Sequence, residues 1–120
     1  MNPAVLVVAV FFAAMGFVAL GKPERIWRPF GATPDTPAAR NEVRAVYGGF
    51  GLAIGCLLAV VDEGAPDQRA GVLLAVAVAL FGMAAGRLIA AAVEPASLKG
   101  FPAVFLIVEA ALGGLLLLAR

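Results

Sequence analysis

The sequence NEVRAVYGGFG, residues 41–51, joins a dense polar patch directly to a glycine-rich apolar segment. Polar residues and glycines recur along this segment and just beyond it at steps of three and four: Asn41, Arg44, Gly48, Gly51 and Gly55. Residues at these steps share one face of a helix. That face begins polar and continues without side chains, which lets a neighbouring backbone approach closely. The stretch therefore predicts a polar site at the edge of a packed membrane helix.

The composition extends this prediction to the whole chain. Of its 120 residues, 62% are hydrophobic, and the mean hydropathy is +0.99, whereas a soluble domain is nearer half apolar. A helix of about 20 apolar residues crosses the ~30 Å hydrocarbon core of a bilayer. We expect an all-α integral membrane protein: one domain, a four-helix up-down antiparallel bundle. Its helices would span about residues 3–21, 37–61, 67–93 and 101–119.

The first apolar segment resembles a retained helix more than a cleaved signal peptide. No basic residue precedes Lys22, and the apolar run is longer than a signal peptide needs. The connection that follows places Trp27 and Phe30 among Lys22, Arg25 and Arg28. Aromatic and basic residues together are typical of a segment at the membrane interface. We expect a short interfacial segment there, acting as an anchor without a binding role.

Two charged residues, Arg87 and Glu109, lie inside predicted membrane spans, where a charge costs roughly 2.5–3.5 kcal/mol on insertion scales. Leu98 lies in the short turn between these helices. Arg87 lies as far before Leu98 in the sequence as Glu109 lies after it. Two antiparallel helices joined at this turn would therefore hold Arg87 and Glu109 at similar depth in the bilayer. We predict that they pair or share a hydrogen-bond network.

The polar start of the second span lies on the same membrane face as this pair, because two crossings separate the two connections. We therefore predict a shared polar cavity in one half of the bilayer. Its candidate ligand-binding residues are Asn41, Glu42, Arg44, Tyr47, Arg87 and Glu109. Its candidate helix-packing residues are Gly48, Gly51, Gly55, Gly82 and Gly86. A purely structural role stays open: the Arg–Glu pair can fix helix register, Arg44 can reach lipid headgroups, and Glu42 can face water.

Several classes of site are disfavoured. The net charge of +1 gives no footprint for nucleic acid. Histidine is absent and Cys56 is the only cysteine, which excludes a histidine-based metal site and a disulfide within the chain. We expect no metal and no cofactor. An enzyme ranks last among the functions considered, because the sequence offers no activated nucleophile and no phosphate-binding glycine loop.

The Lys and Arg residues also suggest an orientation. The first and third connections hold most of them: Lys22, Arg25, Arg28, Arg40 and Lys99. The opposite side holds Arg69 and Arg120. The positive-inside rule then places these connections in the cytoplasm and both termini outside.

The segment Asn41-Glu42-x-Arg44-Ala45-x-Tyr47-Gly48-Gly49, with Gly51 and Gly55 after it, resembles a family of small bacterial four-helix membrane proteins, the domain of unknown function 4345. Gly86-Arg87 and Glu109 also fit its pattern, so the similarity covers most of the chain. A more distant likeness is to DoxX-like four-helix proteins, which include quinone-linked redox subunits and assembly factors. The resemblance implies a bacterial inner-membrane location and a four-helix bundle, without an established activity.

Three kinds of function remain open from the residues. The first is an accessory or binding protein whose cavity holds a lipid, a quinone or another amphipathic ligand. The second is a proton-coupled small transporter, acting as a homo-oligomer, with Glu109 as its titrating group. The third is a structural or assembly subunit that docks its glycine seams, Gly51/Gly55 and Gly82/Gly86, on a membrane protein partner. For these seams we favour the alternative, in which both are used inside the bundle.

Overall fold

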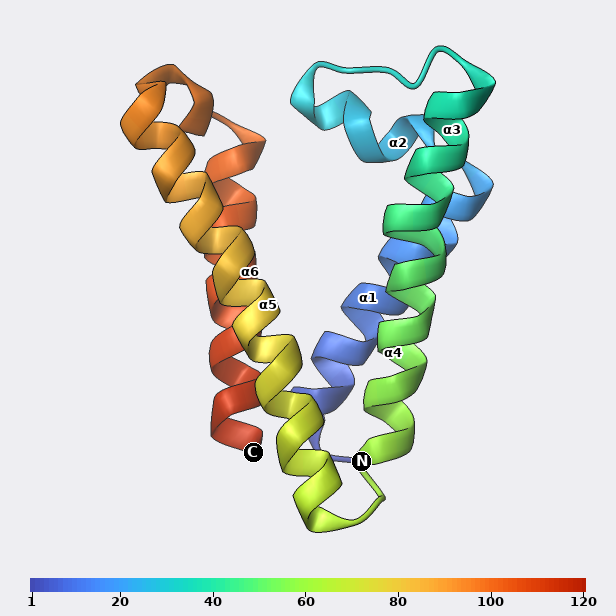
Figure 1. Cartoon of the computed structure of the whole chain (residues 1–120), viewed down its shortest axis with the longest axis vertical. Helices are drawn as coiled ribbons and strands as arrows, with labels where there is room; N and C mark the ends of the chain where they lie inside the picture. Colours follow the sequence, from blue (N-terminus) through green and yellow to red (C-terminus); the bar gives the residue numbers. More distant parts are fainter.

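The computed structural model describes residues 1–120, and all its regular elements are helical. Four helical spans are long and apolar enough to cross a membrane: α1 (Pro3–Gly21), Pro37–Val61, α5 (Pro66–Val93) and α6 (Phe101–Ala119). They alternate in direction, and both termini lie at the lower end of Figure 1. The prediction of an all-α, multi-pass four-helix membrane protein is confirmed. The bounds differ from the expected ranges only at α5, which begins one residue earlier, at Pro66.

The second span contains a π-helical segment between two α-helices. It consists of α3 (Pro37–Val43), η2 (Arg44–Gly49) and α4 (Phe50–Val61). Thr36 caps its start, because the Thr36 side chain accepts a hydrogen bond from the Ala39 amide at 3.0 Å. The Phe50 amide donates to the Ala45 carbonyl, five residues back, as a π-helix requires. Both Arg44 and Gly48 lie within this π-helical segment, so the polar start of the span and its glycine seam meet there.

The connection between α1 and the second span folds into α2 (Glu24–Trp27) and the 3₁₀ helix η1 (Arg28–Phe30). In Figure 1 this segment crosses the upper end of the molecule, from the arm containing α1 toward the arm containing α6. The Phe30 ring packs against the α6 rings of Phe101 and Phe105, with centroids 6.5 and 5.5 Å away. Gly31 then turns the chain with a φ of 78°, which a residue with a side chain rarely adopts. The corresponding turn before α6 contains η3 (Pro95–Leu98).

The helices form two pairs that diverge toward the upper end of the molecule, α1 with α4 and α5 with α6 (Figure 1). Glycines allow α1 and α4 to pack closely. A Cβ atom on Gly51 would lie 2.8 Å from the Phe12 carbonyl oxygen, and one on Gly55 would lie 2.9 Å from the Ala9 carbonyl oxygen. The backbones of α1 and α4 therefore touch at Gly51 and Gly55, whereas Gly48 packs against the side chain of Leu20 in α1.

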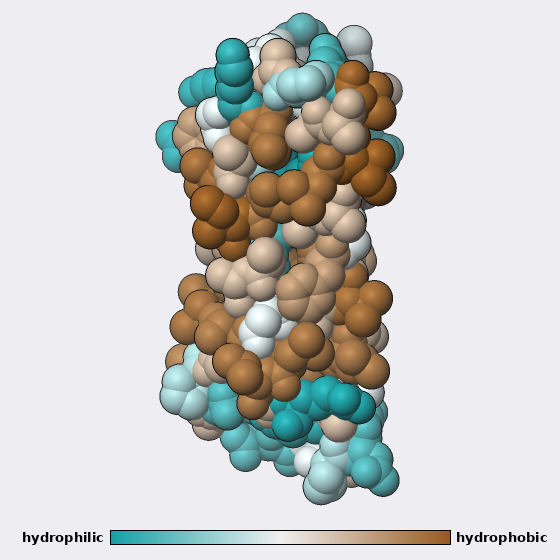
Figure 2. All heavy atoms as spheres, turned by 90° about the vertical axis from the view of Figure 1, so that its left-hand side faces the viewer, coloured by the Kyte–Doolittle hydropathy of each residue, from teal (hydrophilic) through white to brown (hydrophobic).

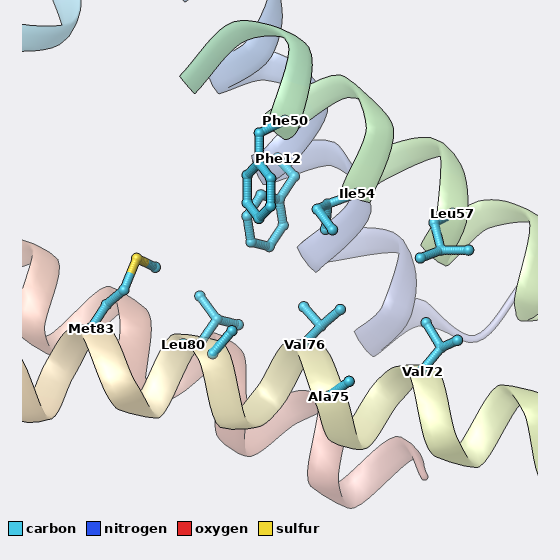
Figure 3. A pocket seen from close by; sticks show the side chains of 10 residues that line it. Phe12, Phe50, Ile54, Leu57, Val72, Ala75, Val76, Leu80 and Met83 are labelled. Carbon is cyan, nitrogen blue, oxygen red and sulfur yellow. The ribbon is translucent and has the colours of Figure 1, made fainter. Parts of the chain in front are cut away.

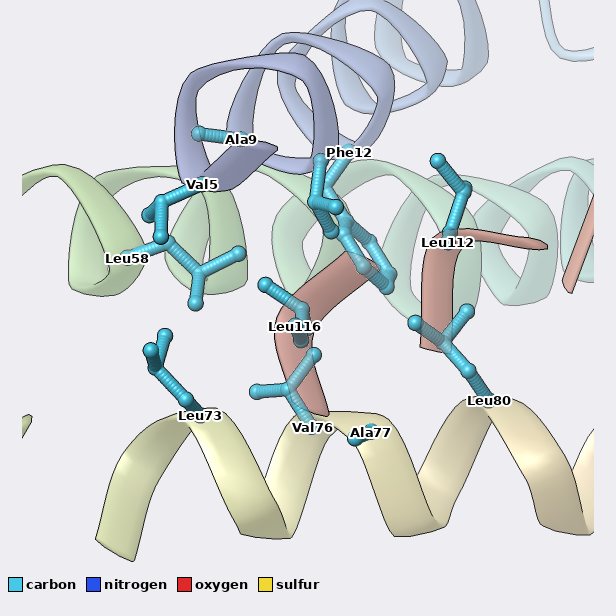
Figure 4. Packing of buried hydrophobic residues seen from close by; sticks show 11 residues of the cluster. Val5, Ala9, Phe12, Leu58, Leu73, Val76, Ala77, Leu80, Leu112 and Leu116 are labelled. Atoms are coloured by element: carbon cyan, nitrogen blue, oxygen red, sulfur yellow. The ribbon is translucent and has the colours of Figure 1, made fainter. Parts of the chain in front are cut away.

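The two pairs are joined by a hydrophobic core in the lower half of the molecule. It holds 11 buried residues contributed by all four spans (Figure 4): Val5, Val8, Ala9, Phe12, Leu58, Leu73, Val76, Ala77, Leu80, Leu112 and Leu116. Leu58, Leu73, Leu80 and Leu116 are fully buried within it. This core fixes the lower ends of the arms, and it ends at the level of Phe12 and Leu112.

A polar cluster below the core, which we call the Asp62 clasp, ties the lower helix ends together. The Asp62 carboxylate accepts a hydrogen bond from the Asn2 amide at 2.6 Å and another from Arg69 Nε at 2.9 Å. Arg69 Nη1 donates to the Ala119 carbonyl oxygen at 2.7 Å. The Asp62 side chain is only 2% exposed. The clasp therefore links the start of α1, the end of α4, the first turn of α5 and the end of α6.

The surface is divided into bands that fit a membrane. In Figure 2 a broad hydrophobic belt separates two hydrophilic ends, the upper around the connections and the lower around the termini. Large apolar side chains in this belt are highly exposed, including Val60, Phe17 and Ile107 at 72%, 68% and 69%. Such exposure is costly in water and favourable in lipid.

Candidate functional site

A cavity of about 1210 Å³ lies between the diverging arms in the upper half of the molecule. Its walls come from α1, η2, α4, α5 and α6, and α2 with η1 forms its roof. Most lining side chains are apolar, among them Phe11, Met15, Val18 and Trp27. Ligand pockets are commonly about 300–1000 Å³, predominantly apolar, with a small number of placed polar groups. The polar lining side chains here are Arg25, Tyr47, Arg87 and Glu109.

Arg87 and Glu109 form a bidentate ion pair at the wall of this cavity. Arg87 Nε donates to Glu109 Oε2 at 2.8 Å, and Nη2 donates to Oε1 at 2.7 Å. The predicted pairing is therefore confirmed. At ~1.5 Å per residue, Arg87 lies roughly 9 Å below the upper end of α5 and Glu109 roughly 12 Å below that of α6, so their depths match. The Glu109 side chain is 4% exposed, whereas that of Arg87 is 27% exposed.

The Arg87 guanidinium is also held by aromatic rings. Its Cζ lies 5.9 Å from the centre of the Phe30 ring and 5.7 Å from that of Phe105, both within cation–π range. Glu109 uses one N–H on Nε and one on Nη2, while the two N–H groups of Nη1 have no acceptor within the protein. Arg87 is therefore fixed in place and retains donors for a molecule in the cavity.

Arg25 and Tyr47 complete the polar lining. Arg25 projects from α2 in the roof, and Tyr47 projects from η2 in the wall. Neither side chain makes a hydrogen bond or an ion pair within the protein. With Arg87 and Glu109 they leave the cavity with one positive charge that no protein group balances. An arginine fork suits carboxylate and phosphate groups, which it can bind through two parallel hydrogen bonds.

The roof is the part of the site that sequence reasoning missed. We expected Arg25, Trp27 and Phe30 to anchor an interfacial segment, whereas all three line the cavity. The one feature of the sequence that could have indicated the roof is the length of this connection, because a long connection can fold back across the bundle. Phe30 finds its ring partners on α6, more than seventy residues later, and no local pattern indicates that contact.

The polar residues at the start of the second span do not line the cavity, so this part of the predicted site is wrong. Arg44 Nε donates to the Leu20 carbonyl oxygen at 3.0 Å, at the end of α1. Carbonyl groups in the last turn of a helix lack a partner within the helix, and Arg44 supplies one. Asn41 and Glu42 are exposed and lie outside the cavity lining. The reason is geometric: the seam that begins with Arg44 packs on α1, so its polar start meets the end of α1.

The second glycine seam also differs from expectation. Gly82 and Gly86 are exposed on α5, and no atom lies within 4 Å of the position that a Cβ atom would take on either residue. The prediction that both seams are used inside the bundle is therefore wrong for this one. Helices α5 and α6 pack through other residues instead, with the Phe81 ring lying 3.0 Å from the Cβ position of Gly113.

The sequence model described as "Domain of unknown function (DUF4345)" matches residues 1–120 of the chain. The chain belongs to this family. No curated protein and no solved structure matches it. The distant likeness to DoxX-like proteins stays a prediction.

The DUF4345 chain has a second hollow, which we call the α4–α5 slot, of about 280 Å³. All ten residues that line it are hydrophobic. In Figure 3, Phe50, Ile54 and Leu57 of α4 face α5 across this slot. Phe12, Phe50 and Met83 line both the slot and the main cavity, so the two hollows adjoin.

Proposed function

We propose that the protein binds an amphipathic molecule, such as a lipid or a quinone, in the cavity between its helix pairs. It would act as a small accessory or binding protein of the bacterial inner membrane. The observation that carries this proposal is the cavity itself, about 1210 Å³ with apolar walls and a fixed arginine donor. An amphipathic ligand matches both parts, because its apolar body contacts the walls and its polar end accepts hydrogen bonds.

The electrostatics favour a ligand with a polar end that can accept hydrogen bonds. Arg87 keeps free Nη1 donors, Arg25 has no partner, and Tyr47 adds a hydroxyl group that is not bonded within the protein. Arg25 is exposed, whereas Tyr47 and Arg87 are half-buried against apolar walls, where unpartnered polar groups are costly unless water or a ligand satisfies them. The Arg25 side of the cavity lies at the end rich in Lys and Arg. By the positive-inside rule this end would face the cytoplasm and the termini would lie outside.

Two alternatives rest on particular features. A proton-coupled transporter, acting as a homo-oligomer, would use the cavity between the diverging arms and Glu109 as its titrating group. The bidentate pair counts against it, because both Glu109 oxygens already accept hydrogen bonds from Arg87. An assembly subunit would pack the α5 face that contains Gly82 and Gly86 against a partner helix, because no atom of the chain lies within 4 Å of their Cβ positions. Neither alternative uses the cavity walls and the free arginine donors together.

Native mass spectrometry of the protein, released gently from detergent, tests the proposal. The variants are Arg25→Gln and Arg87→Gln, and the matched control is Arg28→Gln. Arg28 lies on the same connection, is exposed, and lines neither hollow. We expect a defined adduct on the wild type and the control that is weakened or lost in both cavity variants. A wild-type protein without any adduct, or an adduct equally strong in all four proteins, would contradict the proposal.

A further inference from the structure

We propose that the ligand is an anionic phospholipid whose phosphate lies between Arg25 and Arg87 and whose acyl chain lies in the α4–α5 slot. This inference rests on the proposed function and deepens it, because it assigns the ligand class and a second subsite. The lipid would enter sideways from the bilayer, between α4 and α5.

The main cavity and the α4–α5 slot are continuous. Phe12, Phe50 and Met83 border both of them, so a chain that leaves the cavity downward enters the slot directly. The slot is lined entirely by hydrophobic side chains, as an acyl chain requires and a polar headgroup does not tolerate. Its α5 wall includes two small residues, Ala79 and Ala75. The short side chain of Ala75 leaves width between the helices (Figure 3).

The slot opens toward the side of the molecule, between α4 and α5. The arms contact each other through the core at their lower ends, while α4 and α5 diverge above it (Figure 1). Phe50, Leu57 and Met83 line the slot and are 53%, 40% and 46% exposed. The slot is thus open along its side, within spans whose length and hydropathy suit the bilayer. A lipid could enter it from the bilayer without its acyl chain passing through water.

The charged residues that line the cavity carry a net positive charge. Arg25 and Arg87 carry two positive charges and Glu109 one negative charge, so one positive charge is unbalanced at the cavity. A phosphodiester supplies one negative charge and oxygens that fit an arginine fork. An uncharged quinone would leave Arg25 without a counter-charge. Arg25 and Trp27 line the cavity from the connection between the first two spans, so we expect the headgroup to enter beneath this connection and to reach down toward Arg87.

The size of the cavity separates a phospholipid from a single-chain fatty acid. The cavity is larger than the common range of about 300–1000 Å³ for drug-sized ligands, and the slot adds about 280 Å³. A phospholipid can place one chain in the slot and its glycerol and second chain against the apolar walls of the main cavity. A fatty acid would leave much of that wall uncovered.

Trp27 provides the assay, because it is the only tryptophan and it lines the cavity. The delipidated protein in detergent micelles is titrated with phosphatidylglycerol that carries a nitroxide quencher on the acyl chain close to the glycerol. Phosphatidylcholine and a fatty acid with the same label are the other two ligands. We expect saturable quenching by phosphatidylglycerol. Its dissociation constant should be at least about tenfold lower than that of phosphatidylcholine, a difference of about 1.4 kcal/mol in binding free energy. Arg25→Gln should remove this preference.

Two substitutions on α5 test the slot. Ala79→Phe places a ring where the acyl chain would lie, and Ala85→Phe places the same ring on an exposed part of α5 that lines neither hollow. Both positions are exposed, so both variants can fold. We expect Ala79→Phe to weaken phosphatidylglycerol binding about tenfold and Ala85→Phe to change it less than about twofold.

The outcomes separate this inference from the proposed function. Undiminished binding in Ala79→Phe would overturn the slot and leave the cavity as a binding site. Quenching by the fatty acid alone, or equal quenching by the two phospholipids, would overturn the anionic phospholipid. A change of oligomeric mass in Ala79→Phe without a change in quenching would assign the slot to a second copy of the chain. The absence of both quenching and a native adduct would refute the proposed function as well.

Discussion

Removing either member of the Arg87–Glu109 pair should destabilise the protein, and the two losses should differ. Arg87→Met deletes the guanidinium and leaves the Glu109 carboxylate without its two donors. That side chain is 4% exposed, so water compensates little. Removing one partner of a buried pair costs about 3–5 kcal/mol. We therefore expect Arg87→Met to lower the free energy of unfolding by about 3 kcal/mol or more.

Glu109→Gln should cost less. The amide oxygen can still accept one hydrogen bond, and Arg87 is 27% exposed and flanked by the Phe30 and Phe105 rings. The main loss is one charge-assisted hydrogen bond, worth about 1.5–3 kcal/mol. The double variant removes both charges together, and replacing a whole buried pair by neutral groups is often close to neutral. Its stability should lie nearer the wild type than that of Arg87→Met.

The measurement is reversible unfolding in mixed micelles with increasing sodium dodecyl sulfate, followed by far-ultraviolet circular dichroism. Arg28→Met is the control, because Arg28 is exposed and makes no hydrogen bond or ion pair, and it should stay within about 0.5 kcal/mol of the wild type. Equal small losses in both single variants would refute the buried ion pair. A double variant that loses the full sum of the single losses would do the same, because independent sites add.

Further stability measurements test the two contacts that hold the lower half together. Gly51→Ala should lower the free energy of unfolding by about 1–3 kcal/mol, because its Cβ would lie 2.8 Å from the Phe12 carbonyl oxygen. Gly82→Ala should leave the free energy of unfolding unchanged or raise it by about 0.5–1 kcal/mol, because no atom lies within 4 Å of its Cβ position. Equal effects of Gly51→Ala and Gly82→Ala would argue against the close α1–α4 contact. Asp62→Ala should cost about 3 kcal/mol by leaving Arg69 without its carboxylate partner, and hydrogen exchange should quicken first in the lower helix ends. Unchanged exchange there would show that the core alone holds these ends.

The helices and the ion pair could be predicted because both depend on information that lies close together in the sequence. The length and hydropathy of a span decide whether it crosses a bilayer, with little influence from the rest of the chain. The depth match of Arg87 and Glu109 follows from counting along two helices on either side of one short turn. No knowledge of how the two helix pairs sit together was needed.

The position of Arg44 was mispredicted although the sequence held a relevant signal. Arg44 shares a face with Gly48 and Gly51, and this glycine face was expected to pack closely on a neighbouring helix. Residues on one helix face meet the same neighbour, so Arg44 belongs beside α1, where it donates to the Leu20 carbonyl oxygen. We had assigned one face to two different surroundings, a helix interface and a cavity.

The roof and the shape of the cavity depend on tertiary contacts that no short pattern contains. Phe30 finds Phe101 and Phe105 across the bundle, and this contact brings Arg25 and Trp27 over the cavity. The splay of the arms is likewise a property of the whole assembly. It arises because large apolar side chains fill the space between the pairs only in the lower half.

The unequal construction of the two ends gives the ion pair a second consequence. Below, the core and the Asp62 clasp join all four spans. Above, the bridge from α2 and η1 to the α5–α6 pair runs through the Phe30 ring, which lies over Arg87 and against Phe105. Glu109 fixes the guanidinium on which that ring rests. The Arg87–Glu109 pair thus holds both the wall and the roof of the cavity in place. An apolar contact could have packed α5 against α6 equally well, but it would not have supported the roof, and this accounts for a costly ion pair within the bilayer.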